Sequence, residues 1–308
     1  MPRFLSVRRS LAGFAALIFL CAVTTEARGS TISKTLIALG YEEIALRRTD
    51  ENRLFIFARV NGRKRSCLID SGWSFTSIST NTAGKLTVSN VLERLELGRV
   101  TITNLAARVQ DIRVNGQPAS FDIVLGCDFL LANNAVLDIA GNRLFLRRDQ
   151  PAETDRARIG ERLAATKRAA FALNIRQPPA PTIVARVNGR DMELLVDSGA
   201  TWSCLDADVA QRAGLRSSPS ARQMSGVVGT EKRPFNVAVI DDVRISDARL
   251  AGANFAVLSL TDWGFGPAGG LFPDVSGIFG GAELLANQAV MDFGGRQLWL
   301  RTKGETAH

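Results

Sequence analysis

The chain has 308 residues, with 38 Lys and Arg, 30 Asp and Glu, and a formal net charge of +8. This length allows two domains, each with its own buried core. The only histidine is His308, so catalytic triads and zinc sites that require an internal histidine are excluded. The basic residues are scattered and are not interleaved with aromatic residues, so we expect no nucleic-acid partner.

Residues 1–27 have the three-part pattern of an export signal. Three arginines precede an apolar run over Leu11–Val23, and Thr25-Glu26-Ala27 offers a cleavage site between small residues. The apolar run is too short for a transmembrane helix. We therefore expect an exported protein, periplasmic or secreted, without stable membrane insertion after signal removal.

A first lobe of short strands is predicted over residues 44–147, after a polar lead-in over 28–43. The predicted strands are Leu54–Val60, Cys67–Ile69, Val100–Ile102, Ala106–Val109, Phe121–Leu125, Val136–Asp138 and Leu144–Leu146. Asn61-Gly62, between the first two, is a strong signal for a hairpin turn. A helical or mixed segment is expected over Asn81–Leu97.

A charged linker is predicted over residues 148–168, with a helical piece near Arg158–Lys167. A second lobe over 169–301 and a tail over 302–308 follow. The predicted strands of this lobe are Thr182–Val187, Leu194–Val196, Val237–Ile240, Val243–Ile245, Phe255–Leu258 and Leu298–Leu300. Many short strands separated by turn signals favour a mostly β protein with barrel-like lobes.

The two lobes share repeated segments. Ala58–Arg63 recurs unchanged as Ala185–Arg190, Cys67–Ile78 resembles Leu194–Leu205, and Leu131–Asp138 resembles Leu285–Asp292. The first two pairs are 127 positions apart and the third is 154 positions apart. We interpret this pattern as a tandem duplication with 27 additional residues in the second copy.

The motif Asp-Ser-Gly follows an apolar strand in both copies, at Asp70 and Asp197. The glycine permits a sharp turn and the close approach of another backbone. Two carboxyls about 3 Å apart cannot both ionise readily, so such a pair shares one proton. One carboxylate can then take a proton from water while the other carboxyl donates to a carbonyl oxygen. This chemistry uses neither a metal nor a cofactor, and we expect neither.

The order of these motifs resembles that of the retropepsin-like aspartic proteases over nearly all of the chain after residue 43. An apolar strand, Asp-Ser-Gly-Ala, a Gly-rich hairpin, an apolar-apolar-Gly stretch and a closing hairpin follow one another. The resemblance implies two tandem retropepsin-like β-barrel lobes in a pseudo-two-fold, bilobal acid protease fold. It also implies an aspartic-type endopeptidase with a polypeptide substrate, as a monomer rather than a homodimer.

The resemblance assigns a role to particular residues. Asp70 and Asp197 match the catalytic aspartates, Ser71 and Ser198 the hydroxyls that brace the two loops, Gly72 and Gly199 the glycines that allow close approach, and Gly226, Val227, Val228 and Gly229 the substrate-binding flap. Leu125-Gly126 and Phe279-Gly280 match the segments that pack beneath each loop.

Three features depart from the family pattern. Trp73 replaces the usual Ala or Thr and could crowd the carboxyls, the first lobe lacks a Gly-rich flap, and Tyr41 is the only tyrosine. Two alternatives therefore remain open. One is a peptide-binding module without catalysis, and the other is a dimer of second lobes in which the first lobe is structural.

The cysteines give a separate expectation. Cys67, Cys127 and Cys204 lack metal-ligand spacing and lie among apolar residues. We expect them to be buried as small hydrophobic residues, although one disulfide is possible in an oxidising compartment.

Overall fold

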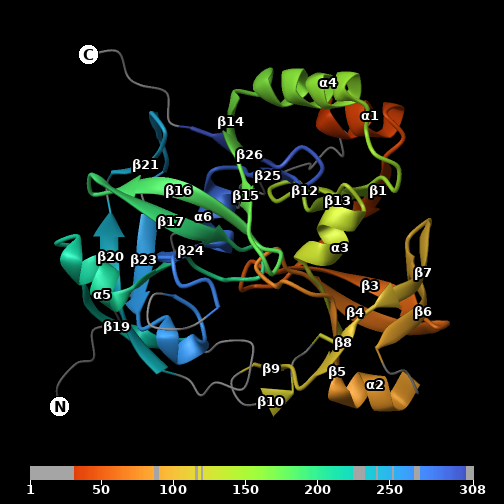
Figure 1. Cartoon of the computed structure of the whole chain (residues 1–308), viewed down its shortest axis with the longest axis horizontal. Helices are drawn as coiled ribbons and strands as arrows, with labels where there is room; N and C mark the ends of the chain where they lie inside the picture. Colours follow the sequence, from red (N-terminus) through yellow and green to blue (C-terminus); the bar gives the residue numbers. More distant parts are fainter. Residues whose placement is uncertain are drawn as a thin grey trace, which may run out of the picture.

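The structure is a computed structural model that describes residues 31–86, 90–114, 117–118, 121–224, 233–240, 242–251, 253–266 and 271–302. The predicted export signal, the predicted flap tip Gly226–Gly229 and residues 303–308 lie outside this part of the chain. The protein is mostly β, with two lobes joined by a shared sheet (Figure 1), which confirms the predicted fold class.

The shared sheet contains three strands from each half of the chain. Its order is β1 (Glu42–Ala45), β13 (Arg143–Leu146), β12 (Val136–Asp138), β25 (Val290–Asp292), β26 (Gln297–Arg301) and β14 (Arg168–Ala172). The central strands pair antiparallel, with Leu137 opposite Met291. These two residues are equivalent in the repeated segments, so a pseudo-two-fold axis passes between them.

The first lobe is an eight-stranded sheet. Its strands are β2 (Arg47–Arg48), β3 (Leu54–Val60), β4 (Arg63–Ile69), β5 (Ser77–Ser79), β6 (Val91–Leu97), β7 (Val100–Ala106), β8 (Arg108–Gln110) and β11 (Ile123–Leu125). Asn61 and Gly62 have φ angles of 47° and 78°, as the predicted β3–β4 hairpin turn requires. The described part of the segment Asn81–Leu97 begins in the helix α2 (Thr80–Leu86) and ends in the strand β6, whose residues pair with β7.

The second lobe is a ten-stranded sheet. Its strands are β15 (Asn174–Ile175), β16 (Pro181–Val187), β17 (Arg190–Val196), β18 (Cys204–Asp206), β19 (Ser218–Met224), β20 (Arg233–Ile240), β21 (Val243–Ile245), β22 (Ala248–Arg249), β23 (Ala253–Leu258) and β24 (Gly277–Phe279). The pairings repeat those of the first lobe: β17 is parallel to β24 as β4 is to β11. The β19–β20 hairpin has no counterpart among the described strands of the first lobe.

Several further elements are short. They are the strands β9 (Arg113–Val114) and β10 (Gln117–Pro118), the helices α3 (Cys127–Ala132), α5 (Ala207–Arg212) and α6 (Gly281–Ala286), and the 3₁₀ helix η1 (Thr261–Trp263). Among the described residues, no helix is both long and apolar enough to cross a bilayer. Cys67, Cys127 and Cys204 are buried free thiols, as expected.

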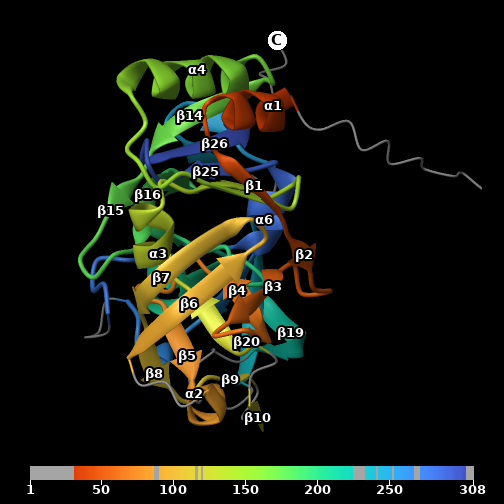
Figure 2. The same cartoon turned by 90° about the vertical axis from the view of Figure 1, so that its right-hand side faces the viewer.

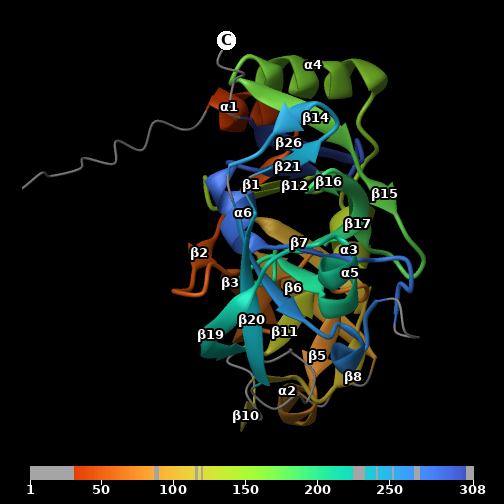
Figure 3. The ribbon, with the colours of Figure 1, turned by 90° about the vertical axis from the view of Figure 1, so that its left-hand side faces the viewer.

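Helices α1 (Thr31–Ala38) and α4 (Glu153–Ala164) cover one face of the shared sheet, opposite the two lobes (Figures 2 and 3). Their side chains and those of the sheet form an apolar cluster of Ile32, Leu36, Leu39, Tyr41, Val136, Phe145, Ile159, Leu163, Val290 and Trp299. α1 lies in the predicted lead-in and α4 in the predicted linker. Both helices are therefore packed parts of the fold.

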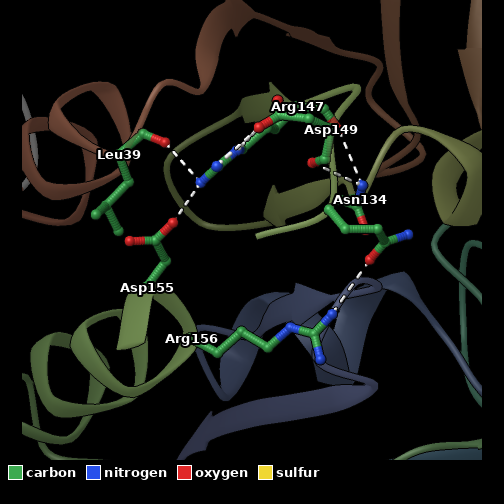
Figure 4. A network of polar contacts seen from close by, with 7 residues as sticks. Leu39, Asn134, Arg147, Asp149, Asp155 and Arg156 are labelled. Atoms are coloured by element: carbon green, nitrogen blue, oxygen red, sulfur yellow. Dashed lines mark hydrogen bonds and ion pairs between the residues drawn. The ribbon is translucent and has the colours of Figure 1, made fainter. Parts of the chain in front are cut away.

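Arg147 connects these two helices to the sheet (Figure 4). Its guanidinium donates to the Leu39 carbonyl after α1 at 2.9 Å and to Asp155 in α4 at 2.7 Å. A third contact joins it to Asp149 at 2.8 Å. The Asn134 amide donates to the Arg147 carbonyl at 3.1 Å. One residue after β13 therefore fixes the position of both covering helices.

Candidate active site

The two Asp-Ser-Gly loops begin where two buried strands end. β4 delivers Asp70 and β17 delivers Asp197. The Asp70 N–H donates to the Leu125 carbonyl at 3.1 Å, and the Asp197 N–H donates to the Phe279 carbonyl at 3.0 Å. The parallel strands β11 and β24 thus support the loops from beneath, at the segments expected for this role.

The two serines connect the loops reciprocally. The Ser71 hydroxyl donates to the Val196 carbonyl at 2.7 Å and accepts from the Ser198 N–H at 2.9 Å. The Ser198 hydroxyl donates to the Ile69 carbonyl at 3.1 Å and accepts from the Ser71 N–H at 3.0 Å. Both serines are buried. Four hydrogen bonds therefore hold the two halves of the chain together directly behind the aspartates.

Each glycine lies against the aspartate of the other loop. A Cβ atom added at Gly72 would lie less than 3 Å from all three carboxyl atoms of Asp197. A Cβ atom added at Gly199 would lie equally close to the carboxyl of Asp70. Any larger residue would collide with a carboxyl at either position, which explains the repeated glycine.

The carboxyls of Asp70 and Asp197 each lie against the glycine of the opposite loop, close enough to influence each other's pKa, and they differ in their backbone donors. Asp70 Oδ1 accepts one backbone hydrogen bond, from the N–H of Trp73 at 3.0 Å. Asp197 Oδ1 accepts two, from the N–H groups of Gly199 at 2.8 Å and Ala200 at 3.0 Å. Two backbone donors stabilise an anion better than one, so Asp197 is the better site for the negative charge.

The pKa directions agree with this asymmetry. Burial raises the pKa of Asp70 well above the usual Asp range, and the adjacent Asp197 carboxylate raises it further. Burial also raises the pKa of Asp197, but the hydrogen bonds from Asp70, Gly199 and Ala200 lower it. The nearby Arg53 cation lowers the pKa of both carboxyls. The second backbone donor to Asp197 therefore favours the negative charge on Asp197 and the proton on Asp70.

Trp73 does not separate the two carboxyls. Its indole N–H donates to the Ser77 hydroxyl at 2.8 Å. The ring packs beside a buried apolar cluster of Leu68, Ile112, Phe121 and Val124. The indole thus forms part of the cleft wall on the first-lobe side, and the two carboxyls of one chain remain in contact.

Two further carboxyls support the loops, and sequence reasoning missed both. Asp128 accepts from the Thr76 N–H at 2.8 Å and from its hydroxyl at 2.9 Å. Glu283 accepts from the Ser203 N–H at 3.0 Å and from its hydroxyl at 2.5 Å. Burial raises the pKa of Glu283 above the usual Glu range. The available signal was a hydroxyl residue six positions after each aspartate.

The aspartates lie in a cleft of about 730 Å³ between the lobes. This is the size of a typical ligand site. The lining residues outside the loops include Asp50, Glu51, Asn52, Arg53, Arg108, Gln110, Pro178, Arg222, Gln223, Met224, Trp263, Phe265, Leu271 and Phe272. The β19 residues among them show that the hairpin bearing the predicted flap borders this cleft.

Other catalytic groups are not favoured by their surroundings. Burial raises the pKa of Cys127 and of Cys204 to about 12, so both thiols stay protonated near neutral pH. The described residues contain no group of three or more His, Cys, Asp or Glu side chains that could hold a metal ion. The paired aspartates are therefore the strongest chemical feature of the cleft.

Comparison with known proteins agrees with this geometry. Residues 183–280, which include Asp197 and most of the second lobe, match the family model described as aspartyl protease. The second lobe is thus similar to an aspartyl protease domain over these residues, which agrees with the predicted resemblance there. No curated protein matches the chain significantly.

Several solved structures are similar to the chain. A retropepsin-like aspartic protease from Rickettsia conorii is 21% identical over 34% of this chain and 90% of its own, with a TM-score of 0.28. Basic 7S globulin from soybean is 12% identical over 85% of this chain and 95% of its own, with a TM-score of 0.43. Conglutin gamma, a basic 7S globulin from lupine seeds, is 10% identical with the same coverage and a TM-score of 0.45.

Proposed function

We propose that the protein is an aspartic endopeptidase in which Asp70 and Asp197 together activate a water molecule. The close approach of the two Asp-Ser-Gly loops, which places both carboxyls in one cleft between the lobes, is the observation that carries this proposal. Such a pair holds one proton over an acidic pH range, and this state can act as acid and base at once.

Each carboxyl has a distinct role in the proposed reaction. The Asp197 carboxylate takes a proton from water, and the resulting oxygen nucleophile attacks the peptide carbonyl carbon. Asp70 donates its proton to the carbonyl oxygen, where negative charge would otherwise develop. The Asp70 carboxylate then takes a proton back from a hydroxyl of the tetrahedral intermediate, the C–N bond breaks, and the amine leaves with the proton held by Asp197, which restores the starting pair. The Ser71–Ser198 hydrogen bonds hold the carboxyls in register during these transfers.

Substitution of either aspartate tests the mechanism. We expect Asp70→Asn and Asp197→Asn each to slow cleavage of an unfolded protein by at least about a hundredfold, because each removes a proton-transfer group. A pepstatin-like inhibitor should block the native protein. The matched control is Asp247→Asn at an exposed position. Activity retained in Asp70→Asn would refute the proposed mechanism. Peptide binding without turnover at any pH from roughly 3 to 7 would favour a binding module instead.

We also propose that the enzyme works outside the cytoplasm as a monomer. The predicted export signal over residues 1–27 supports export. The meeting of Asp70 and Asp197 within one chain supports a complete site in each copy. Cell fractionation should find the processed protein outside the cytoplasm, and sedimentation should give the mass of one chain. A cytoplasmic full-length protein or an active dimer would contradict the respective proposal.

A further inference from the structure

Two arginine–aromatic pairs line the cleft, one in each lobe. The Arg108 guanidinium lies 3.5 Å from the ring centre of Phe75, and that of Arg222 lies 5.4 Å from a ring centre of Trp202. Phe75 and Trp202 both stand five positions after an aspartate of the pair. All four residues line the cleft. The two lobes therefore present a stacked cation at corresponding places beside the two acidic loops.

The arginines themselves come from different elements. Arg108 opens β8, where its N–H donates to the Thr76 carbonyl at 2.9 Å. Arg222 lies in β19, on the hairpin that has no counterpart among the first-lobe strands that the structure describes. The two aromatic residues therefore occupy equivalent positions of the sequence repeat, whereas the two arginines come from strands that are not equivalent.

Neither guanidinium forms a hydrogen bond or ion pair with a side chain or carbonyl in the described part of the chain. By contrast, Arg53 in the same cleft pairs with Glu51 at 3.3 Å. Asp50 is the remaining lining carboxyl outside the aspartate pair, and it is exposed to solvent. Stacking on an aromatic face restricts a guanidinium but leaves its N–H edge available for a carboxylate.

We infer that Arg108 and Arg222 select substrates with acidic side chains on both sides of the cleaved bond. This inference rests on the proposed peptidase function. A peptide that crosses the aspartate pair passes from one lobe to the other, and so meets one stacked arginine on each side. Its Asp or Glu carboxylates can accept paired N–H donors from these guanidiniums. The free carboxyl terminus of a peptide offers the same chemistry, so the test separates the two sources.

Binding and cleavage are measured separately, so that the preference for acidic peptides and the peptidase function are tested independently. Binding uses Asp70→Asn protein and fluorescent, C-terminally amidated peptides with Glu, Gln or Lys at positions flanking one central bond. We expect the peptide with Glu on both sides to bind about tenfold more tightly than its Gln counterpart. Arg108→Gln and Arg222→Gln should each remove the preference on one side only. Arg216→Gln, which lies outside the cleft lining, should keep both preferences.

Charge reversal provides the sharper cleavage experiment. Native protein is incubated with a mixed peptide library at pH 5, where Asp and Glu are ionised, and the cleaved bonds are sequenced. Acidic residues should be enriched on both sides of these bonds. In Arg108→Glu and in Arg222→Glu, Lys and Arg should replace the acidic residues as the enriched residues on one side of the cleaved bond.

The outcomes separate the two proposals. Equal binding of Glu and Gln peptides, or unchanged cleavage preferences in the Glu variants, would overturn the inference while leaving the peptidase intact. Tighter binding only of peptides with a free C-terminus would also overturn it. If the binding preference holds and depends on both arginines while nothing is cleaved, the inference stands as a binding preference and the peptidase proposal fails.

Discussion

Arg53 is a positively charged residue of the cleft that affects the pKa of both aspartates. Its side chain is only 12% exposed, and its charge lowers the pKa of both Asp70 and Asp197. Burial acts in the opposite direction on both carboxyls. The pH range of the proposed activity should therefore depend on a cation that lies outside both Asp-Ser-Gly motifs.

Replacing Arg53 should move the pH profile of cleavage. In Arg53→Gln the positive charge is lost, so protons bind more tightly to the pair and both limbs of the profile should shift to higher pH. The measurement is kcat/KM from pH 3 to 8 on one peptide. Arg59→Gln, an exposed arginine on β3, should leave the profile unchanged. A shift to lower pH would contradict the assigned influence of Arg53.

Gly72 sets how closely the two carboxyls approach. Gly72→Ala places a methyl group against the Asp197 carboxyl, so we expect the pair to separate and activity to fall by about a hundredfold or more. The control is Gly84→Ala in α2, where an added Cβ meets no atom within 4 Å. That change should keep activity and stabilise the fold by up to about 1 kcal/mol. Cleavage rates and thermal unfolding of both variants test this contrast.

At the scale of elements, α1 packs into an apolar cluster although it lies in the segment predicted to be a polar lead-in. Leu36 is fully buried against the shared sheet, whereas the adjacent Ile37 is 53% exposed. The carbonyl of Leu39, just after the helix, accepts from Arg147 and so joins α1 to the network of α4. We therefore regard the segment after the predicted signal as structural.

A pair of neighbouring substitutions tests the role of α1. Leu36→Ala should lower the free energy of unfolding by about 2–4 kcal/mol, because it leaves a cavity in the cluster beneath the helix. Ile37→Ala should change it by less than about 1 kcal/mol, since that side chain is largely in solvent. Denaturant unfolding measures both. Equal effects would show that α1 is not packed as described.

At the scale of the whole molecule, the shared sheet and the paired loops bury carboxyls from both halves. Burial raises the pKa of Asp138 and Asp292 in the sheet, and of Glu283 beneath the second loop, as it does for the aspartate pair. By contrast, Arg147 lowers the pKa of the exposed Asp149. The buried carboxyls thus favour the folded state most when they are protonated.

Stability should therefore increase as the pH falls from 7 to 5. A carboxyl whose pKa is higher in the folded state binds protons more tightly there, so the free energy of unfolding rises as pH falls through that pKa. Pairs such as Arg147–Asp149 lose their contribution only near pH 4 and below. We expect a higher Tm at pH 5 than at pH 7, and a smaller difference in Asp292→Asn. A Tm that falls from pH 7 to pH 5 would contradict this expectation.

The sequence by itself determined the local features of this protein. Strands such as Leu54–Val60 and turns such as Asn61-Gly62 depend on alternation and backbone preference over a few residues, and the structure has both. The repeated Asp-Ser-Gly motif located the two loops, because only glycine fits against the carboxyl of the opposite loop and glycine therefore occurs in both copies. The mixed segment Asn81–Leu97 divided into α2 and β6 only through pairing with β7.

The tertiary structure decided which residues from distant parts of the sequence contact each other. The roles of Asp128 and Glu283 arise only when α3 and α6 bring them to the loops, so spacing along the chain did not reveal them. The unequal donors to Asp70 and Asp197 depend on loop conformation, and the place of Trp73 depends on the apolar cluster beside it. Burial, pKa and cleft shape arise from contacts between segments that are distant along the chain, which no local pattern encodes.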